Sequence, residues 1–148
     1  MRCCLTKPWC IVSNSPEETL TAGENLSSKL QPGSVIALYG GLGAGKTCLA
    51  KGIAQGLGIT ENITSPTYTI INEYPLANNS SLYHIDAYRL NGDADFESTG
   101  AGDYIGGSGI TVIEWSDRIP RSIPPGAITI RIEITGPLSR IFRIEGLP

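Results

Sequence analysis

Residues 40–47, with the sequence GGLGAGKT, combine the residue types and the spacing that binding of a phosphate chain requires. Gly40, Gly45, Lys46 and Thr47 fit the G-x-x-x-x-G-K-S/T pattern of a P-loop. Glycines let the backbone curl until several N–H groups face one phosphate chain. Lys46 adds a positive charge for the outer phosphates, and the Thr47 hydroxyl can coordinate magnesium. The pattern therefore predicts binding of a nucleoside triphosphate.

A P-loop also needs an acidic side chain at the end of another strand, which holds the magnesium ion or its waters. Glu114 follows the apolar run 110–113, whereas Asp86 follows the more polar run 82–85. Because an apolar run should lie centrally in a sheet, burial favours Glu114 as the acid on the magnesium side. An acid at a helix N-terminus is the alternative interpretation of Glu114.

Several other polar groups lie close to these acids in the sequence. His84, Asp86, Tyr88 and Arg89 fall within six residues. They are consistent with a titratable pair that orients water or senses the γ-phosphate, and equally with a structural polar network. Cys48 falls in the first turn of the helix expected after the P-loop, where the helix dipole should lower its thiol pKa and make it reactive.

The elements that would position this chemistry alternate between helix and strand. A strand at 35–38 precedes the P-loop, and apolar residues at helical spacing follow it. Ser15 and Glu18 form a capping box with Pro16 at the first helical position, which predicts a helix that ends before Pro32.

Further strands are predicted at 67–74, 81–85 and 110–113, and a closing antiparallel hairpin at 127–134 and 140–144. The glycine-rich stretch 92–109 should form a short helix around Phe96 and a mobile loop. The order predicts an α/β fold, a three-layer P-loop NTPase sandwich with a mixed, mainly parallel central sheet. We expect a single domain over 1–148, with 1–12 as a first strand or a poorly ordered start.

Composition narrows the classes of partner. The chain has 148 residues, a net charge of −3 and a pI of about 5.1, so it lacks the basic surface of a protein that grips DNA or RNA by itself. No apolar run approaches the length of a membrane span, and no signal peptide is recognisable at the start. We expect a cytoplasmic protein with free thiols that does not contact membranes.

The motifs occur in one order: LGAGKT at 42–47, SPTY at 65–68, H-x-D-x-Y-R-L at 84–90 and V-I-E-W at 112–115. In this succession the chain resembles the bacterial TsaE (YjeE) family of small P-loop ATPases. The resemblance implies ATP and Mg²⁺ as cofactors and a role in forming threonylcarbamoyladenosine in tRNAs that read ANN codons. It also implies docking on the TsaD and TsaB proteins, with tRNA contacted only through that complex.

The resemblance further implies residue roles. Lys46, Asp86, Glu114 and Thr67 would serve hydrolysis, Asp86 as a Walker B-like or water-orienting carboxylate and Thr67 in a switch-like loop. Magnesium would be held by Thr47 and Glu114, and residues 15–19 would border the adenine. The nucleotide would be bound by Gly43, Ala44, Gly45, Lys46, Thr47, Cys48 and Arg140.

Two positions depart from the family pattern. The family usually has an acidic residue in place of Gly41, and Thr or Ser in place of Cys48. Neither departure should abolish nucleotide binding, because the backbone N–H of Cys48 remains available. A small P-loop kinase and a nucleotide-dependent binding module without useful turnover are the alternative functions.

Overall fold

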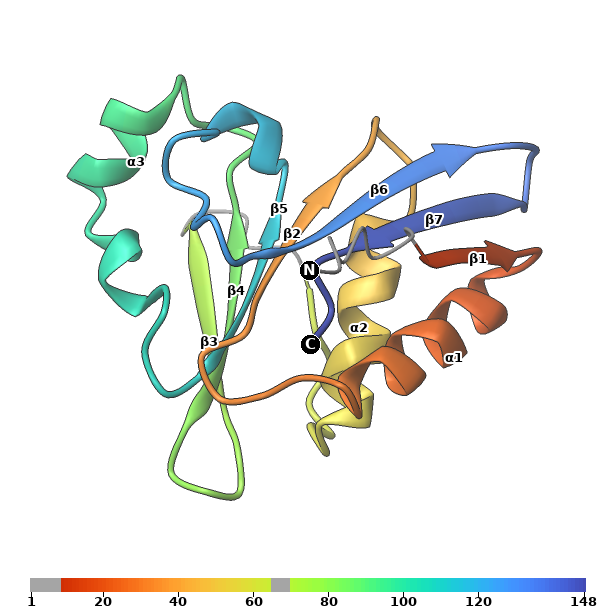
Figure 1. The fold of residues 1–148 in the computed structure, drawn as a ribbon, viewed down its shortest axis with the longest axis horizontal. Coiled ribbons are helices and arrows are strands. Elements are labelled where there is room, and N and C mark those ends of the chain that lie inside the picture. The colour runs from red at the N-terminus through yellow and green to blue at the C-terminus, as the bar shows by residue number, and fades with distance from the viewer. Residues whose placement is uncertain (1–8, 65–69) are drawn as a thin grey trace, which may run out of the picture.

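The computed structural model describes residues 9–64 and 70–148, which form one mixed sheet flanked by helices (Figure 1). Seven strands occur in the described part of the chain, in the spatial order β1-β7-β6-β2-β5-β4-β3. Their bounds are β1 Trp9–Ser13, β2 Val35–Tyr39, β3 Ile71–Pro75, β4 Ser81–Asp86, β5 Ile110–Glu114, β6 Ile128–Ile134 and β7 Arg140–Glu145.

The sheet is parallel at its centre and antiparallel toward both edges. Strands β6, β2, β5 and β4 run parallel, whereas β1 pairs with β7, β7 with β6 and β3 with β4 in antiparallel fashion. The predicted mixed sheet and closing hairpin are therefore confirmed, with parallel pairs confined to the four inner strands.

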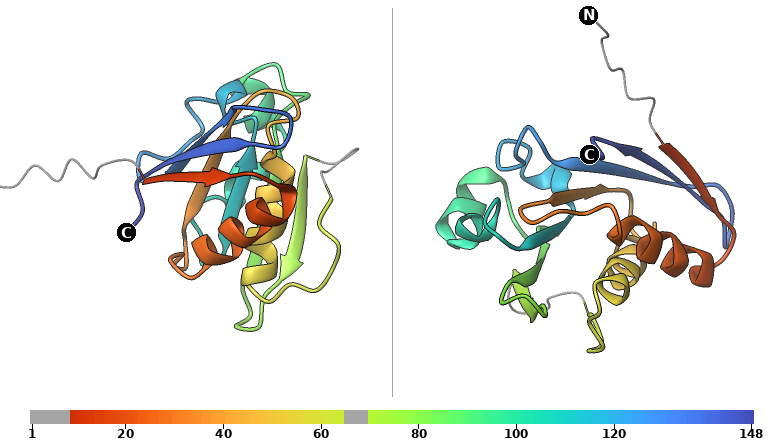
Figure 2. Two further views of the ribbon diagram at one scale, coloured as in Figure 1. Left: turned by 90° about the vertical axis from the view of Figure 1, so that its right-hand side faces the viewer. Right: turned by 60° about the horizontal axis from the view of Figure 1, so that its bottom comes forward.

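Helices cover both faces of the sheet, as the two views in Figure 2 show. Helices α1 (Pro16–Ser27) and α2 (Lys46–Gly56) pack on one face, over side chains such as Leu38 and Val112. The short helix α3 (Asp93–Ser98) and the 3-10 turns η1 (Ala101–Tyr104) and η2 (Ser116–Arg118) lie at the other face. Because side chains alternate along a strand, Val112 faces α2 while Ile113 joins the core beneath α3.

The capping box predicted at the start of α1 is present, with one difference. The Ser15 hydroxyl accepts a hydrogen bond from the Glu18 N–H at 3.1 Å, and the Glu18 carboxylate accepts from the Asn14 N–H at 2.7 Å, one residue before the N-cap. The helix ends at Ser27, where i→i+3 bonds from Lys29 and Leu30 tighten the chain into a turn.

Two glycines allow α1 and α2 to touch backbone to backbone. A Cβ added at Gly52 would overlap the Leu20 carbonyl oxygen, and one at Gly23 would lie 2.7 Å from the Leu49 carbonyl oxygen. Close contact of this kind fixes α2, and with it the P-loop at its N-terminus, relative to the rest of the fold.

The remaining predictions are partly tested. The short helix expected around Phe96 is α3, where Phe96 is buried. Strand β1 overlaps the range 1–12 expected for a first strand and ends one residue beyond it, at Ser13. Residues 65–69, and with them the start of the strand predicted at 67–74, lie outside the described residues. Among those described, no helix combines the length and the apolar character that crossing a membrane requires.

Candidate functional site

The P-loop connects β2 to α2 and adopts the curled conformation that its glycines permit. Gly43 has φ +75° and Gly45 has φ +101°, both in the left-handed region. A Cβ at either position would meet no atom within 4 Å, so the requirement for glycine here is conformational. At Gly40 the requirement is steric, since a Cβ would come within 3.0 Å of the Ala44 Cβ.

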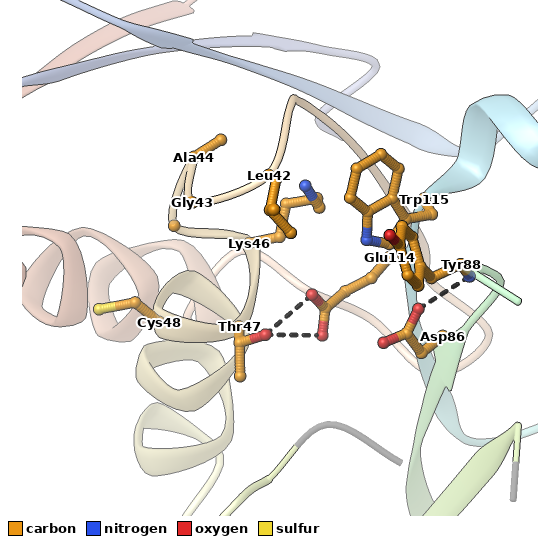
Figure 3. Close-up of a pocket in the computed structure, with 11 residues that line it drawn as sticks. Leu42, Gly43, Ala44, Lys46, Thr47, Cys48, Asp86, Tyr88, Glu114 and Trp115 are labelled. Carbon is orange, nitrogen blue, oxygen red and sulfur yellow. Dashed lines mark hydrogen bonds between the residues drawn. The ribbon is translucent and has the colours of Figure 1, made fainter. Parts of the chain in front are cut away.

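A cavity of about 370 Å³ opens over this loop (Figure 3). Its walls come from the P-loop, from the start of α2, and from the ends of β4 and β5, which places three of the four predicted motifs around one space. The lining residues are Leu42, Gly43, Ala44, Gly45, Lys46, Thr47, Cys48, Asp86, Tyr88, Glu114 and Trp115.

Thr47 and Glu114 meet inside this cavity. The Thr47 hydroxyl donates to the Glu114 carboxylate, with oxygen distances of 2.9 and 3.2 Å (Figure 3). His84 contacts the same carboxylate from β4, at 2.5 Å between Nε2 and Oε2, and both members of this pair are buried. The interpretation of Glu114 as an acid that faces the P-loop from the central strand β5 therefore agrees with the geometry.

This pair fits a magnesium site of the P-loop type. A hydroxyl and a carboxylate are hard oxygen ligands of the kind that Mg²⁺ prefers, and the ion usually completes its shell with phosphates and water. Among residues 9–64 and 70–148, no group of three or more His, Cys, Asp or Glu side chains is arranged to hold a metal by itself.

Asp86 lies beside Glu114, because the two are register partners in the parallel pair β4–β5. One of its carboxylate oxygens accepts from the Tyr88 N–H at 2.9 Å. Partial burial raises the pKa of Asp86 above the usual aspartate range, while the Tyr88 N–H opposes that rise. Asp86 is the second carboxylate at the cavity wall, and it is less buried than Glu114. The Thr47 hydroxyl contacts Glu114.

Lys46 folds back onto its own loop. Its Nζ donates to the carbonyl oxygens of Gly40 and Gly41 at 2.6 and 2.8 Å, and lies 3.9 Å from the ring centroid of Trp115. Burial lowers the pKa of the Lys46 ammonium, and the negative charge of Glu114 opposes this. The ammonium thus lies at the cavity wall, within a cation–π contact.

Trp115 and Tyr88 form an aromatic wall; sequence reasoning placed Tyr88 in the polar cluster near the acids but did not assign Trp115 to the site. Their rings are 4.9 Å apart, and the Arg118 guanidinium lies 5.4 Å from the Tyr88 ring. Trp115 has φ +57°, an outlier for a bulky residue, and this backbone turns its ring toward Lys46. The V-I-E-W motif pointed to the position, but the left-handed backbone is not readable from the residue type.

Arg140 braces the P-loop from outside the cavity. Its Nε donates to the Ala44 carbonyl and its Nη2 to the Gly43 carbonyl, both at 3.1 Å, while Nη1 binds the carbonyls of Gly136 and Ser139 in its own turn. Arg140 was predicted to bind the nucleotide, and that role stays a prediction; the observed contacts are to backbone oxygens of the P-loop.

A smaller cavity of about 80 Å³ adjoins the 370 Å³ cavity over the P-loop, which we call the phosphate cavity after the ligand predicted for it. The two cavities share Gly45 and Cys48. It is bordered by the N-terminus of α1 and by the β6–β7 turn, including three residues of the 15–19 segment that was expected to border adenine. Its lining residues are Ser15, Pro16, Thr19, Gly45, Cys48, Pro137, Leu138 and Arg140.

The prediction of a lowered Cys48 pKa is wrong. Burial raises the pKa of this thiol, with Lys51 acting in the opposite direction and Glu17 adding to the rise. Packing against α1 is the physical reason, because the Cys48 sulfur lies 3.5 Å from the Pro16 carbonyl oxygen.

Gly41, the other unusual position, is exposed, and a Cβ there would meet no atom within 4 Å. Thr67 and the SPTY motif lie outside the described residues, so their role stays a prediction.

Comparison with known proteins assigns this arrangement to a family. A family model described as "Threonylcarbamoyl adenosine biosynthesis protein TsaE" matches residues 13–141. A "tRNA threonylcarbamoyladenosine biosynthesis protein TsaE" from Treponema pallidum is 43% identical over 123 residues, which are 83% of this chain and 90% of the relative. The protein of the same name from Bacillus subtilis is 40% identical over 124 residues, covering 82% of this chain and 75% of the relative.

The fold has a counterpart among solved structures. The crystal structure of YdiB from Bacillus subtilis is similar to this chain with a TM-score of 0.80 and 33% sequence identity. The similarity covers 96% of this chain and 87% of that one. The α/β sandwich predicted from the sequence is therefore also supported by an experimentally determined neighbour.

Proposed function

Because this chain belongs to the TsaE family of threonylcarbamoyl adenosine biosynthesis proteins, we propose that it serves tRNA threonylcarbamoyladenosine formation as an Mg²⁺-dependent ATPase subunit. The observation that carries the ATPase proposal is the contact between the Thr47 hydroxyl and the buried Glu114 carboxylate. It lies beside a loop in which Gly43 and Gly45 adopt the left-handed backbone conformation. The loop proposed to bind phosphate and the acid proposed to bind metal meet there in one cavity.

In this proposal the backbone N–H groups of residues 43–48 hold the phosphates of ATP, and Thr47 and Glu114 hold Mg²⁺. Bound magnesium neutralises charge on the phosphates and so lowers the cost of breaking the terminal bond. Lys46 exchanges its carbonyl partners in the loop for a phosphate, which its flexible four-carbon stem allows. Asp86 is the carboxylate left to orient a water molecule, since Thr47 is bonded to Glu114.

Adenine is proposed as the base from the family resemblance, and the smaller cavity is the place proposed for it. It continues from the phosphate cavity through Gly45 and Cys48 and ends at Ser15, Pro16 and Thr19 of the α1 N-terminus. A base placed there would lie between the helix start and the β6–β7 turn, next to Leu138.

We propose the TsaD and TsaB proteins as partners and tRNA as a substrate contacted only through them. The net charge of −3 supports this division, because RNA binding by the chain alone would call for a basic surface. A role in tRNA modification would place the protein in the cytoplasm.

Phosphate release by the purified chain, measured with ATP and Mg²⁺ in the absence and presence of a TsaB–TsaD complex, tests the proposal. We expect slow release alone and faster release with the complex. A phosphorylated acceptor in place of free phosphate would indicate a kinase and overturn the proposal.

A genetic test separates hydrolysis from binding. In cells depleted of the native protein, we expect Lys46→Ala and Glu114→Ala to leave threonylcarbamoyladenosine in tRNA at the depleted level. Full restoration by both variants would show that hydrolysis is dispensable and would favour a binding module.

A further inference from the structure

His84 and Glu114 form a buried pair behind the phosphate cavity. His84 is 1% exposed and Glu114 is 2% exposed, and the two lie on the neighbouring parallel strands β4 and β5. The register pairs His84 with Val112, so the imidazole reaches diagonally along the sheet to a carboxylate two residues further on. Both side chains point to the α2 side, as do Leu82 and Val112.

The Glu114 carboxylate needs such a contact to keep its orientation. A glutamate side chain has three rotatable bonds, and fixing them costs conformational entropy that a single contact offsets only in part. The Thr47 hydroxyl has one proton to share between the two carboxylate oxygens, at 2.9 and 3.2 Å. His84 Nε2 makes a further contact with this carboxylate, at 2.5 Å from Oε2.

The other ring nitrogen indicates which tautomer makes this bond. His84 Nδ1 is buried and has no hydrogen-bond partner among residues 9–64 and 70–148. A proton on Nδ1 would be a buried donor without an acceptor, which costs more than a lone pair left unpaired. The geometry thus fits an imidazole that donates from Nε2 to the Glu114 carboxylate.

We propose that His84 is a positioning residue for the acid on the magnesium side. Its Nε2–H holds the Glu114 carboxylate toward Thr47 and the phosphate cavity, and so prepares the pair to bind the metal. Partners of this kind are common behind metal ligands, where they fix the ligand's direction. The inference rests on the proposed function, in which Thr47 and Glu114 hold Mg²⁺ beside a bound nucleotide.

Two substitutions separate the hydrogen bond from the volume of the ring. His84→Leu fills much of the space and removes the donor, whereas His84→Gln places an amide N–H near the position of Nε2. Ile85→Val is the matched control, because Ile85 is equally buried on β4 but faces the opposite core. Thermal unfolding of each variant establishes that it folds. If His84→Leu does not fold, His84→Asn replaces it, because the asparagine amide is too short to reach Glu114.

The measurement is the affinity for a fluorescent, non-hydrolysable ATP analogue, once with excess Mg²⁺ and once with EDTA. The ratio of the two affinities isolates the contribution of the metal. We expect His84→Leu to lower this ratio by about tenfold, the lower end of the range for partners behind metal ligands. We expect His84→Gln to restore most of it, Ile85→Val to match the wild type, and affinity in EDTA to stay unchanged in all three.

A double variant tests whether His84 acts through Glu114. In a Glu114→Ala background, His84→Leu should have no further effect on the Mg²⁺-dependent ratio, because the group that it positions is gone. An unchanged ratio in folded His84→Leu, or a full additional loss in the double variant, would overturn the inference. A wild-type protein that gains no affinity from Mg²⁺ would instead contradict the proposed function.

Discussion

Replacing Arg140 with alanine should weaken nucleotide binding without removing any group that faces the phosphate cavity. Arg140 is half-buried, and its guanidinium joins the β6–β7 turn to the P-loop through the carbonyl oxygens of Gly43 and Ala44. A carbonyl held outward leaves the N–H of the next peptide free to face inward. Loss of Arg140 would let these peptides rotate, so that binding has to order them again.

The size of the effect follows from two hydrogen bonds of 3.1 Å. Bonds to a charged donor contribute about 1.5–3 kcal/mol each, and solvent access to the half-buried guanidinium lowers this to about 1 kcal/mol for each of the two bonds. Two such bonds give an upper limit of about 2 kcal/mol, or roughly a 30-fold loss of affinity. The bonds to Gly136 and Ser139 stabilise the turn and should appear mainly in the free energy of unfolding.

The assay is fluorescent-nucleotide binding in EDTA, carried out with both the ATP and the ADP forms. Because Arg140 acts through the loop backbone, we expect both nucleotides to lose affinity equally in Arg140→Ala. Arg143→Ala is the control, since Arg143 lies on the same strand but pairs at the surface with Glu133 at 3.0 Å. Its affinity should equal that of the wild type.

Two results would refute this reasoning. Unchanged affinity in folded Arg140→Ala would show that the loop holds its shape without the guanidinium. A loss confined to the ATP form would show a direct contact with the terminal phosphate, as a residue that binds nucleotide itself would make.

Three further outcomes are expected. Burial raises the pKa of Asp86, so the folded state loses stability as pH rises from the usual aspartate range through that raised pKa. Asp86→Asn should therefore stabilise the free protein at pH 7, as measured by urea unfolding, while it lowers ATP hydrolysis. Equal stability of the variant and the wild type would contradict this. Gly52→Ala should lower the free energy of unfolding by about 1–3 kcal/mol through overlap with the Leu20 carbonyl, even though alanine favours helix; a gain in stability would show that α1 moves away at little cost. Burial raises the pKa of Cys48, so mass spectrometry should find slower alkylation at Cys48 than at the exposed Cys10 at pH 7, and faster labelling of Cys48 would show that the helix dipole outweighs burial.

Much of the fold could be predicted because its determinants are local. The uninterrupted apolar run at 110–113 predicted a buried strand, and β5 is buried at every position. The alternation of apolar and polar residues predicted β6, and Ser15 with Glu18 marked the start of α1 within its own turn. The end of α1 was harder to place, because Leu30 continues the apolar pattern while the chain has already left the helix at Ser27. Its packing against the core, and not helix formation, accounts for its apolar character.

The error at Cys48 has a related cause. The helix N-terminus is a local feature and was identified, whereas the desolvation that raises the thiol pKa comes from α1, which approaches from another part of the chain. Burial of a titratable group depends on all the elements packed around it, so one segment of sequence does not reveal which term dominates.

By itself the sequence determined that residues 40–47 form a loop of the P-loop type between a strand and a helix, because left-handed glycines, a lysine and a hydroxyl are local requirements. Only the tertiary structure decided which groups meet around that loop. Thr47 touches Glu114 across 67 positions of sequence, and Arg140 touches Ala44 across 96. Contacts between such distant residues follow from strand order and register, which arise when the whole sheet assembles and which no local pattern encodes.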